Sequence, residues 1–99
     1  MTEAIYYILL SLRRANHGYG IIQEVAEMTG GRVNLGPGTL YGAINSLLEK
    51  GWIVLVRAET DSRKKKEYVI TNAGREAFAA ETKRLKELLE NGRKMEEEP

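Results

Sequence analysis

The sequence predicts a mostly α-helical protein that carries one small β-hairpin. Apolar residues recur at helical spacing through residues 3–49, change to a period of about two after Gly51, and return to helical spacing from residue 72. Two short runs, 52–56 and 67–70, are rich in β-branched or aromatic residues and enclose a polar segment, which predicts two antiparallel strands. We therefore expect three short helices, a hairpin and a final helix.

The first helix is expected from about Glu3 to Arg14, with Thr2 as its N-cap. One apolar stripe consists of Ile5, Ile8, Leu9 and Leu12, while Tyr6, Tyr7 and Leu10 lie off it. A surface helix needs only one buried stripe, so the second apolar side predicts contact with another helix, such as one from a partner chain.

A turn is expected at residues 15–18, followed by a second helix from about Tyr19 to Met28. Its inward side is expected to carry Ile22, Val25 and Ala26, and the pair Gly30-Gly31 is expected to end it.

The third helix is expected to begin at Pro37, which suits the first helical position, and to end before Gly51. Its apolar stripe consists of Leu40, Ile44, Leu47 and Leu48. The opposite face carries uncharged groups that form hydrogen bonds, together with one glycine: Thr39, Tyr41, Gly42, Asn45 and Ser46. A solvated face would be richer in Lys and Glu, so this face is expected to contact a partner.

Positive charge is concentrated in the hairpin, although the net charge of the whole chain is only +1. Residues 57–66 contain five basic and two acidic residues, a local balance of +3. Most short charge runs are solvated loops. Beside a polar helix face, however, this run predicts contacts with the phosphates of a nucleic acid.

A last helix is expected from about Asn72 to Asn91, capped by Thr71. Its apolar side consists of Ala77, Phe78, Leu85, Leu88 and Leu89, with a spacing similar to that of a coiled coil. Residues 92–99 are polar and acidic and are expected to form a flexible tail.

Several classes of function are not expected from the composition. The chain has no cysteine and one histidine, so neither a thiolate zinc site nor a metal cluster is expected. The sequence offers no recognisable nucleophile-base pair, and its two Gly-x-Gly pairs lack the third glycine of a dinucleotide site. The longest apolar run, 4–10, is far shorter than the ~20 residues of a membrane helix. We therefore expect a protein with no enzymatic activity, cofactor, metal or membrane partner.

Three short helices followed by a two-stranded hairpin are the element order of a winged helix-turn-helix, whose third helix enters the major groove of DNA. Four stretches of the chain also resemble PadR-type transcriptional regulators. They are His17-Gly18-Tyr19, the run LGPGTLY at 35–41, the run LEKGWI at 48–53, and Lys65-Lys66 through Tyr68 to Thr71 with Gly74. The resemblance covers about residues 5–90, and its most specific part is the G-T-L-Y core with its flanking proline.

The resemblance implies a homodimeric repressor with a winged-helix DNA-binding domain at 1–71, a dimerisation helix at 72–91 and a tail at 92–99. The implied DNA-binding residues are Tyr19, Pro37, Gly38, Thr39, Tyr41, Asn45, Arg63, Lys64, Lys65 and Lys66. The expected dimer interface consists of Ile5, Tyr6, Leu9, Phe78, Leu85, Leu88 and Leu89. One departure from the family pattern is Gly20, which is expected to loosen the start of the second helix.

The expected function is sequence-specific regulation of transcription, with double-stranded DNA and a second copy of the chain as partners. The implied location is the cytoplasm, at the nucleoid when the protein is bound to DNA. A small-molecule effector of unknown identity beside Tyr6 and Tyr7 is left open. The alternative is a winged-helix adaptor whose Thr39, Tyr41 and Asn45 face meets a protein instead of DNA.

Overall fold

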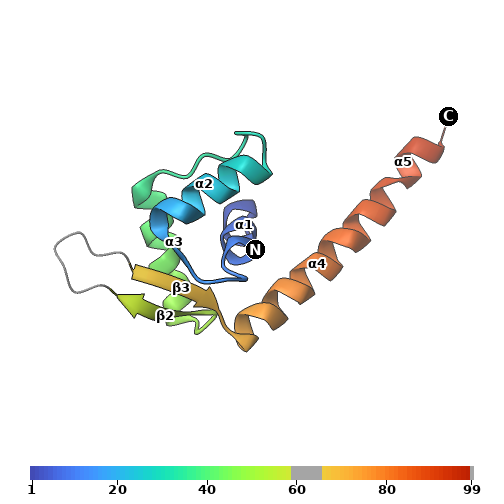
Figure 1. The fold of residues 1–99 in the computed structure, drawn as a ribbon. Coiled ribbons are helices and arrows are strands. Elements are labelled where there is room, and N and C mark those ends of the chain that lie inside the picture. The colour runs from blue at the N-terminus through green and yellow to red at the C-terminus, as the bar shows by residue number, and fades with distance from the viewer. Residues whose placement is uncertain (59–65, 99) are drawn as a thin grey trace.

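The computed structural model describes residues 1–58 and 66–98. Its elements are α1 (Glu3–Ser11), β1 (Asn16–His17), α2 (Gly18–Met28), α3 (Pro37–Glu49), β2 (Ile53–Ala58), β3 (Lys66–Ile70), α4 (Asn72–Gly92) and α5 (Lys94–Glu97). The first three helices and the sheet form one body, and α4 extends away from it (Figure 1). The molecule therefore measures 62 × 28 × 19 Å. The predicted order of three helices, a hairpin and a final helix is confirmed.

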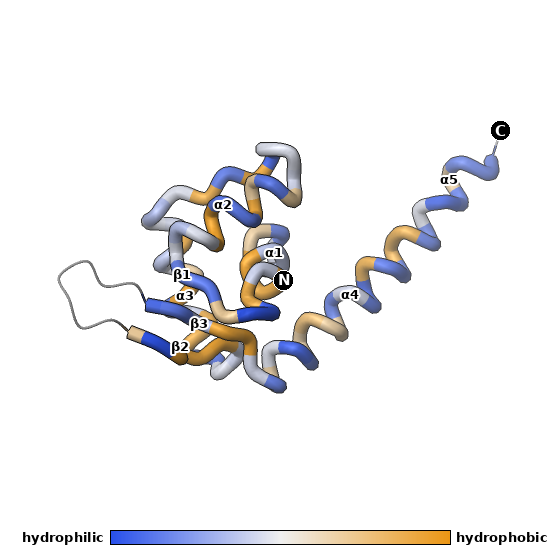
Figure 2. Tube along the Cα trace, in the orientation of Figure 1, coloured by the Kyte–Doolittle hydropathy of each residue, from blue (hydrophilic) through white to orange (hydrophobic). Residues whose placement is uncertain are grey.

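The hydrophobic core lies between α1, α2, α3 and the inner ends of the strands, where Figure 2 shows apolar segments facing one another. It consists of Ile8, Leu9, Leu12, Ile21, Val25, Leu35, Leu40, Ile44, Leu47, Ile53, Tyr68 and Ile70. The buried residues of α2 are Gly18, Ile21 and Val25. They are three and four positions apart, so they lie on one side of the helix. The prediction of Val25 and Ile22 as inward residues is confirmed, since Val25 is buried and Ile22 packs against the core while half-buried. The prediction of Ala26 is corrected, because this residue is half-buried and is not part of the core.

The first helix is shorter than predicted. Thr2 caps it as expected, since the Ile5 N–H donates to the Thr2 hydroxyl at 3.2 Å. The helix ends at Ser11 instead of Arg14 because the chain must turn there to bring residues 16–17 beside β3. The Arg13 guanidinium stabilises this end by donating from Nη1 to the Leu10 carbonyl at 2.8 Å.

The sheet has three antiparallel strands in the order β1-β3-β2. The hairpin is as predicted, but the expected turn at 15–18 contains the additional strand β1, whose Asn16 lies opposite Tyr68. Between Leu55 and Arg57 the register shifts by one residue, which leaves Arg57 opposite Glu67 and Ala58 opposite Lys66. Without this bulge Arg57 would lie opposite Lys66, and two like charges directly across a sheet are unfavourable.

The last helix begins where the sequence predicts, with the Gly74 N–H donating to the Thr71 hydroxyl oxygen at 3.1 Å. Residues 94–97, expected to be part of a flexible tail, instead form the short helix α5. The backbone at Arg93 continues the hydrogen bonding of α4, since its N–H donates to the Leu89 carbonyl at 3.1 Å. In the part of the chain that the structure describes, every helix is too short or too polar to cross a membrane.

Candidate nucleic-acid interface

The polar face of α3 is exposed, as its sequence predicts. Pro37 occupies the first helical position after the N-cap Gly36, and Leu40, Ile44 and Leu47 point into the core. On the opposite side Thr39, Gly42, Asn45 and Ser46 are exposed, and Tyr41 keeps 50% of its surface accessible. The exposure of this face is confirmed, whereas its contact with DNA stays a prediction.

An open hollow of about 640 Å³ lies between the start of α2, the face of α3 and β3. Its lining consists of His17, Gly18, Tyr19, Tyr41, Asn45, Lys66 and Tyr68. Four residues that the sequence marks as DNA-binding, from three separate elements, therefore surround one space: Tyr19, Tyr41, Asn45 and Lys66. We call these four residues and the hollow the α2–α3–β3 face.

Sequence reasoning missed His17, Gly18 and Tyr68 as parts of this face. The first two directly precede Tyr19, and Tyr68 is two residues from Lys66 in a strand, where alternate residues share a side. The spacing of Lys66 and Tyr68 was therefore a signal that both side chains point toward α3.

The tyrosines of the hollow differ in their burial. Tyr19 is 65% exposed, whereas Tyr68 is only 6% exposed and forms the floor. Burial raises the pKa of the Tyr68 phenol, and the neighbouring Tyr41 raises it further. Tyr68 therefore keeps its proton and adds no negative charge to the hollow.

The chemistry of this face suits a polyanion. Tyrosine hydroxyls and a lysine ammonium are groups that donate hydrogen bonds to phosphate oxygens, and an asparagine amide can pair with a base edge. The only acidic residue of β3, Glu67, is not among the residues that line the hollow and lies opposite Arg57 in the sheet. Among the described residues, the lining of the hollow therefore contains no carboxylate beside the Lys66 ammonium.

The other predicted DNA contacts divide into two groups. Pro37, Gly38 and Thr39 are exposed in the first turn of α3, at the positive end of the helix dipole. Arg63, Lys64 and Lys65 lie outside the described residues.

The residues predicted to form a dimer interface differ in their burial: some are exposed, some are half-buried and one is fully buried. Leu85, Leu88 and Leu89 are exposed on α4, at 38%, 53% and 59%. Tyr6 and Phe78 stack on each other within the same chain, with ring centroids 4.3 Å apart, and Ile5 is half-buried against the core. The assignment of Leu9 to the interface is corrected, because its side chain is fully buried in the core of its own chain.

A smaller hollow, of about 220 Å³, lies beside Tyr6 and Tyr7 at the contact of α1 with α4. Small-molecule sites usually measure about 300–1,000 Å³, so the expectation of an effector there gains no support from its size. Among residues 1–58 and 66–98, no three His, Cys, Asp or Glu side chains are close enough to hold a metal ion.

Comparisons with known proteins agree with this geometry. The family model described as "Transcriptional regulator PadR-like family" matches residues 7–80. A PadR family transcriptional regulator from Eggerthella lenta superposes with a TM-score of 0.82 at 19% identity, over 96% of this chain and 82% of that one. This similarity confirms the predicted winged-helix fold. No curated protein matches the chain.

Two further solved structures are similar at higher identity. RosR from H. salinarum is 30% identical, with a TM-score of 0.68 over 84% of this chain and 72% of that one. PadR from Bacillus subtilis, solved in complex with operator DNA, is 25% identical. Its TM-score is 0.69, over 81% of this chain and 46% of that one.

Proposed function

The chain belongs to the PadR-like family of transcriptional regulators, and from this premise we propose that it is a homodimeric repressor of transcription. It binds an inverted-repeat operator through α3 and the β2–β3 hairpin. Membership also confirms the prediction that the chain is a regulator and not an enzyme. The observation that carries the proposal is the α2–α3–β3 face, where Tyr19, Tyr41, Asn45 and Lys66 surround one hollow.

In the proposed complex α3 lies in the major groove of the operator. Asn45 is the base-reading residue, since an asparagine amide can pair with both hydrogen-bonding groups of adenine. Tyr19, Tyr41 and Lys66 hold the phosphates on either side of the groove and set the register of the helix. The operator complex of the Bacillus subtilis relative supports DNA as the partner.

The dimer is proposed from the exposed leucines of α4. Leu85, Leu88 and Leu89 form an exposed apolar stripe on α4, and Leu85 lies at the edge of the contact between α4 and α1. An exposed apolar patch of this kind typically marks a protein interface. A two-fold dimer through this stripe would present two α3 helices to half-sites about 34 Å apart, one turn of DNA.

The test is an unbiased selection of double-stranded DNA with the full chain, followed by measurement of the molecular mass in solution. We expect enrichment of an inverted repeat, with a dissociation constant between about 10⁻⁸ and 10⁻¹¹ M at physiological salt. Absence of any enriched sequence would contradict specific DNA binding, and a monomeric mass at micromolar concentration would contradict the dimer. The PadR-like membership does not depend on either result.

A further inference from the structure

The base of α4 is hydrogen-bonded directly to the turn that ends α3. Gly51, with a φ of +72°, terminates α3, and the Thr71 hydroxyl donates to its carbonyl at 2.6 Å. The Thr71 N–H donates to the next carbonyl, that of Trp52, at 2.9 Å. Because the same hydroxyl oxygen accepts from the Gly74 N–H, one side chain both caps α4 and ties it to α3.

Gly74 allows this close approach because it has no side chain. It is buried, and a Cβ at this position would overlap the carbonyl oxygen of Trp52 and come within 2.7 Å of Ile70 Cγ1. The first of these atoms belongs to the backbone and cannot rotate away. The direction in which α4 leaves the domain therefore depends on the absence of one methyl group.

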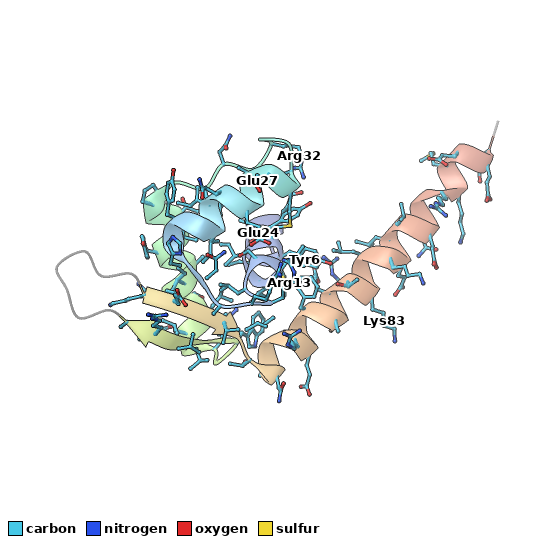
Figure 3. The ribbon with its side chains drawn as sticks, in the orientation of Figure 1. Tyr6, Arg13, Glu24, Glu27, Arg32 and Lys83 are labelled. Carbon is cyan, nitrogen blue, oxygen red and sulfur yellow. The ribbon has the colours of Figure 1, made fainter. Side chains whose placement is uncertain are left out.

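A second contact holds α4 two turns further along. The Phe78 ring stacks on Tyr6 of α1 at an interplanar angle of 20°. Because the Thr82 hydroxyl donates to the Phe78 carbonyl, the Tyr6 hydroxyl is the donor in its 2.7 Å bond to Thr82. Figure 3 shows Tyr6 on the side of α1 that faces α4. The leucine stripe begins at Leu85, directly beyond this contact.

We propose that this α4 clamp, made by Thr71, Gly74 and the Tyr6–Phe78 pair, determines the spacing of the two operator half-sites. The inference depends on the proposed function, because it requires a dimer through α4 that is bound to DNA. In that dimer the leucine stripes meet at the two-fold axis, so the angle between α4 and the domain sets the distance between the two α3 helices.

The length of α4 makes this distance sensitive to small tilts. Leu85 follows Thr71 by fourteen residues, which at about 1.5 Å per residue is about 21 Å along the helix. A tilt of about 10° at the base moves Leu85 by about 4 Å, which is close to the ~3.4 Å rise of one base pair. Moving the base of α4 by about the size of one methyl group is therefore enough to change the preferred number of base pairs between the two half-sites.

The experiment compares Gly74→Ala with Gly92→Ala, which adds the same methyl group to the same helix. A Cβ on Gly92 has no heavy atom of the described residues within 4 Å, so this variant is the matched control. Each protein selects from a library in which two half-sites, taken from the wild-type selection, are inverted and separated by spacers of every length up to one DNA turn. Circular dichroism establishes that each variant is folded.

We expect the wild type and Gly92→Ala to prefer the same spacer. Gly74→Ala is expected to shift the preferred spacer by about one base pair or more, while its affinity for an isolated half-site is unchanged. A folded Gly74→Ala protein with the wild-type spacer preference would overturn the inference.

Thr71→Val provides the test where Gly74→Ala does not fold, because it keeps the shape of the side chain and removes both hydroxyl hydrogen bonds. Loosening of the clamp is expected to broaden the spacer distribution, and an unchanged distribution would overturn the inference while leaving the proposed function intact. A wild-type protein that enriches no paired half-sites would contradict the proposed dimeric function itself, and the inference with it.

Discussion

The hydroxyl group of Tyr41 lies against the α-carbon of Gly18, so close that a Cβ on residue 18 would be 2.5 Å from the hydroxyl oxygen. The next atoms are Tyr41 Cζ at 3.0 Å and Leu40 Cδ2 at 3.4 Å from the same position. Both residues line the hollow of the α2–α3–β3 face. The first residue of α2 therefore determines where α3 presents the Tyr41 hydroxyl.

We expect Gly18→Ala to displace the Tyr41 hydroxyl instead of unfolding the protein, because the nearest atom is the end of a half-exposed side chain that can rotate away. The free energy of unfolding should therefore change by less than about 1 kcal/mol. Urea denaturation measures this change, with Gly92→Ala as the unobstructed control. In a Tyr41→Phe background, which lacks the nearest atom, Gly18→Ala should cost no stability. A loss well above about 1 kcal/mol in Gly18→Ala would show that Tyr41 cannot move aside.

Elements with local signals were predictable from the sequence. Pro37 and Gly51 delimit α3, and Thr71 starts α4, because caps and glycine stops act within a few residues of chain. The polar side of α3 was predictable too, because the spacing of Leu40, Ile44 and Leu47 determines which side is buried.

Features that depend on distant residues were not predictable. Asn16 and His17 have little strand preference of their own, and they form β1 only because β3 offers them a partner. Gly20 was expected to loosen α2. In the structure a Cβ at this position would overlap the side-chain oxygen of Asn16, so the glycine makes room for the first residue of β1. The fit of Gly74 against Trp52 likewise exists only in the folded chain.

Lys66 is predicted to contact phosphate, so its removal should change the salt dependence of DNA binding. Replacing Lys66 with alanine is expected to reduce the slope of log affinity against log salt concentration by about 0.9, the contribution of one phosphate. Lys83→Ala is the control for the same charge change, because Lys83 projects from α4 away from α1 (Figure 3). Fluorescence anisotropy over a salt series measures both slopes. Equal slopes for the two variants would favour the adaptor alternative, in which this face meets a protein.

Asn45 is predicted to read a base, so its loss should affect specific binding more than non-specific binding. We expect Asn45→Ala to weaken binding to the selected operator by about 1–3 kcal/mol and to leave binding to a scrambled duplex nearly unchanged. Asn91→Ala, at an exposed position on α4, is the control for loss of an amide. Equal weakening on both duplexes would assign Asn45 to the DNA backbone instead of the bases.

The leucine stripe of α4 is predicted to hold the dimer together. Leu88→Asp places a charge in the middle of the stripe, where burial without a partner is unfavourable, and is expected to give a monomer by analytical ultracentrifugation. Lys83→Asp introduces the same carboxylate on the opposite side of the helix and should leave the mass unchanged. A dimeric Leu88→Asp protein would show that the interface lies elsewhere.

The ion pair between Glu81 and Arg84 predicts a loss of stability in acid. The Glu81 carboxylate accepts from Arg84 Nε at 2.8 Å and from Nη2 at 2.7 Å, and these bonds hold the pKa of Glu81 below its ordinary value of 4.5. A depressed pKa in the folded state means that the unfolded chain takes up this proton first. The stabilisation is therefore complete above pH 4.5 and is lost as the pH falls through the folded value.

Glu81→Gln should consequently be less stable than the wild type at neutral pH, and the difference should shrink as the pH falls below 4.5. Urea denaturation at a series of pH values measures this difference directly. Arg84→Gln removes the same two hydrogen bonds from the other partner and is expected to give the same trend. Glu81 lies beside Thr2, Tyr6 and Tyr7 at the contact of α4 with the start of the chain. A stability difference that stays constant from neutral pH to below 4.5 would mean that Glu81 acts through its shape in this contact and not through its charge.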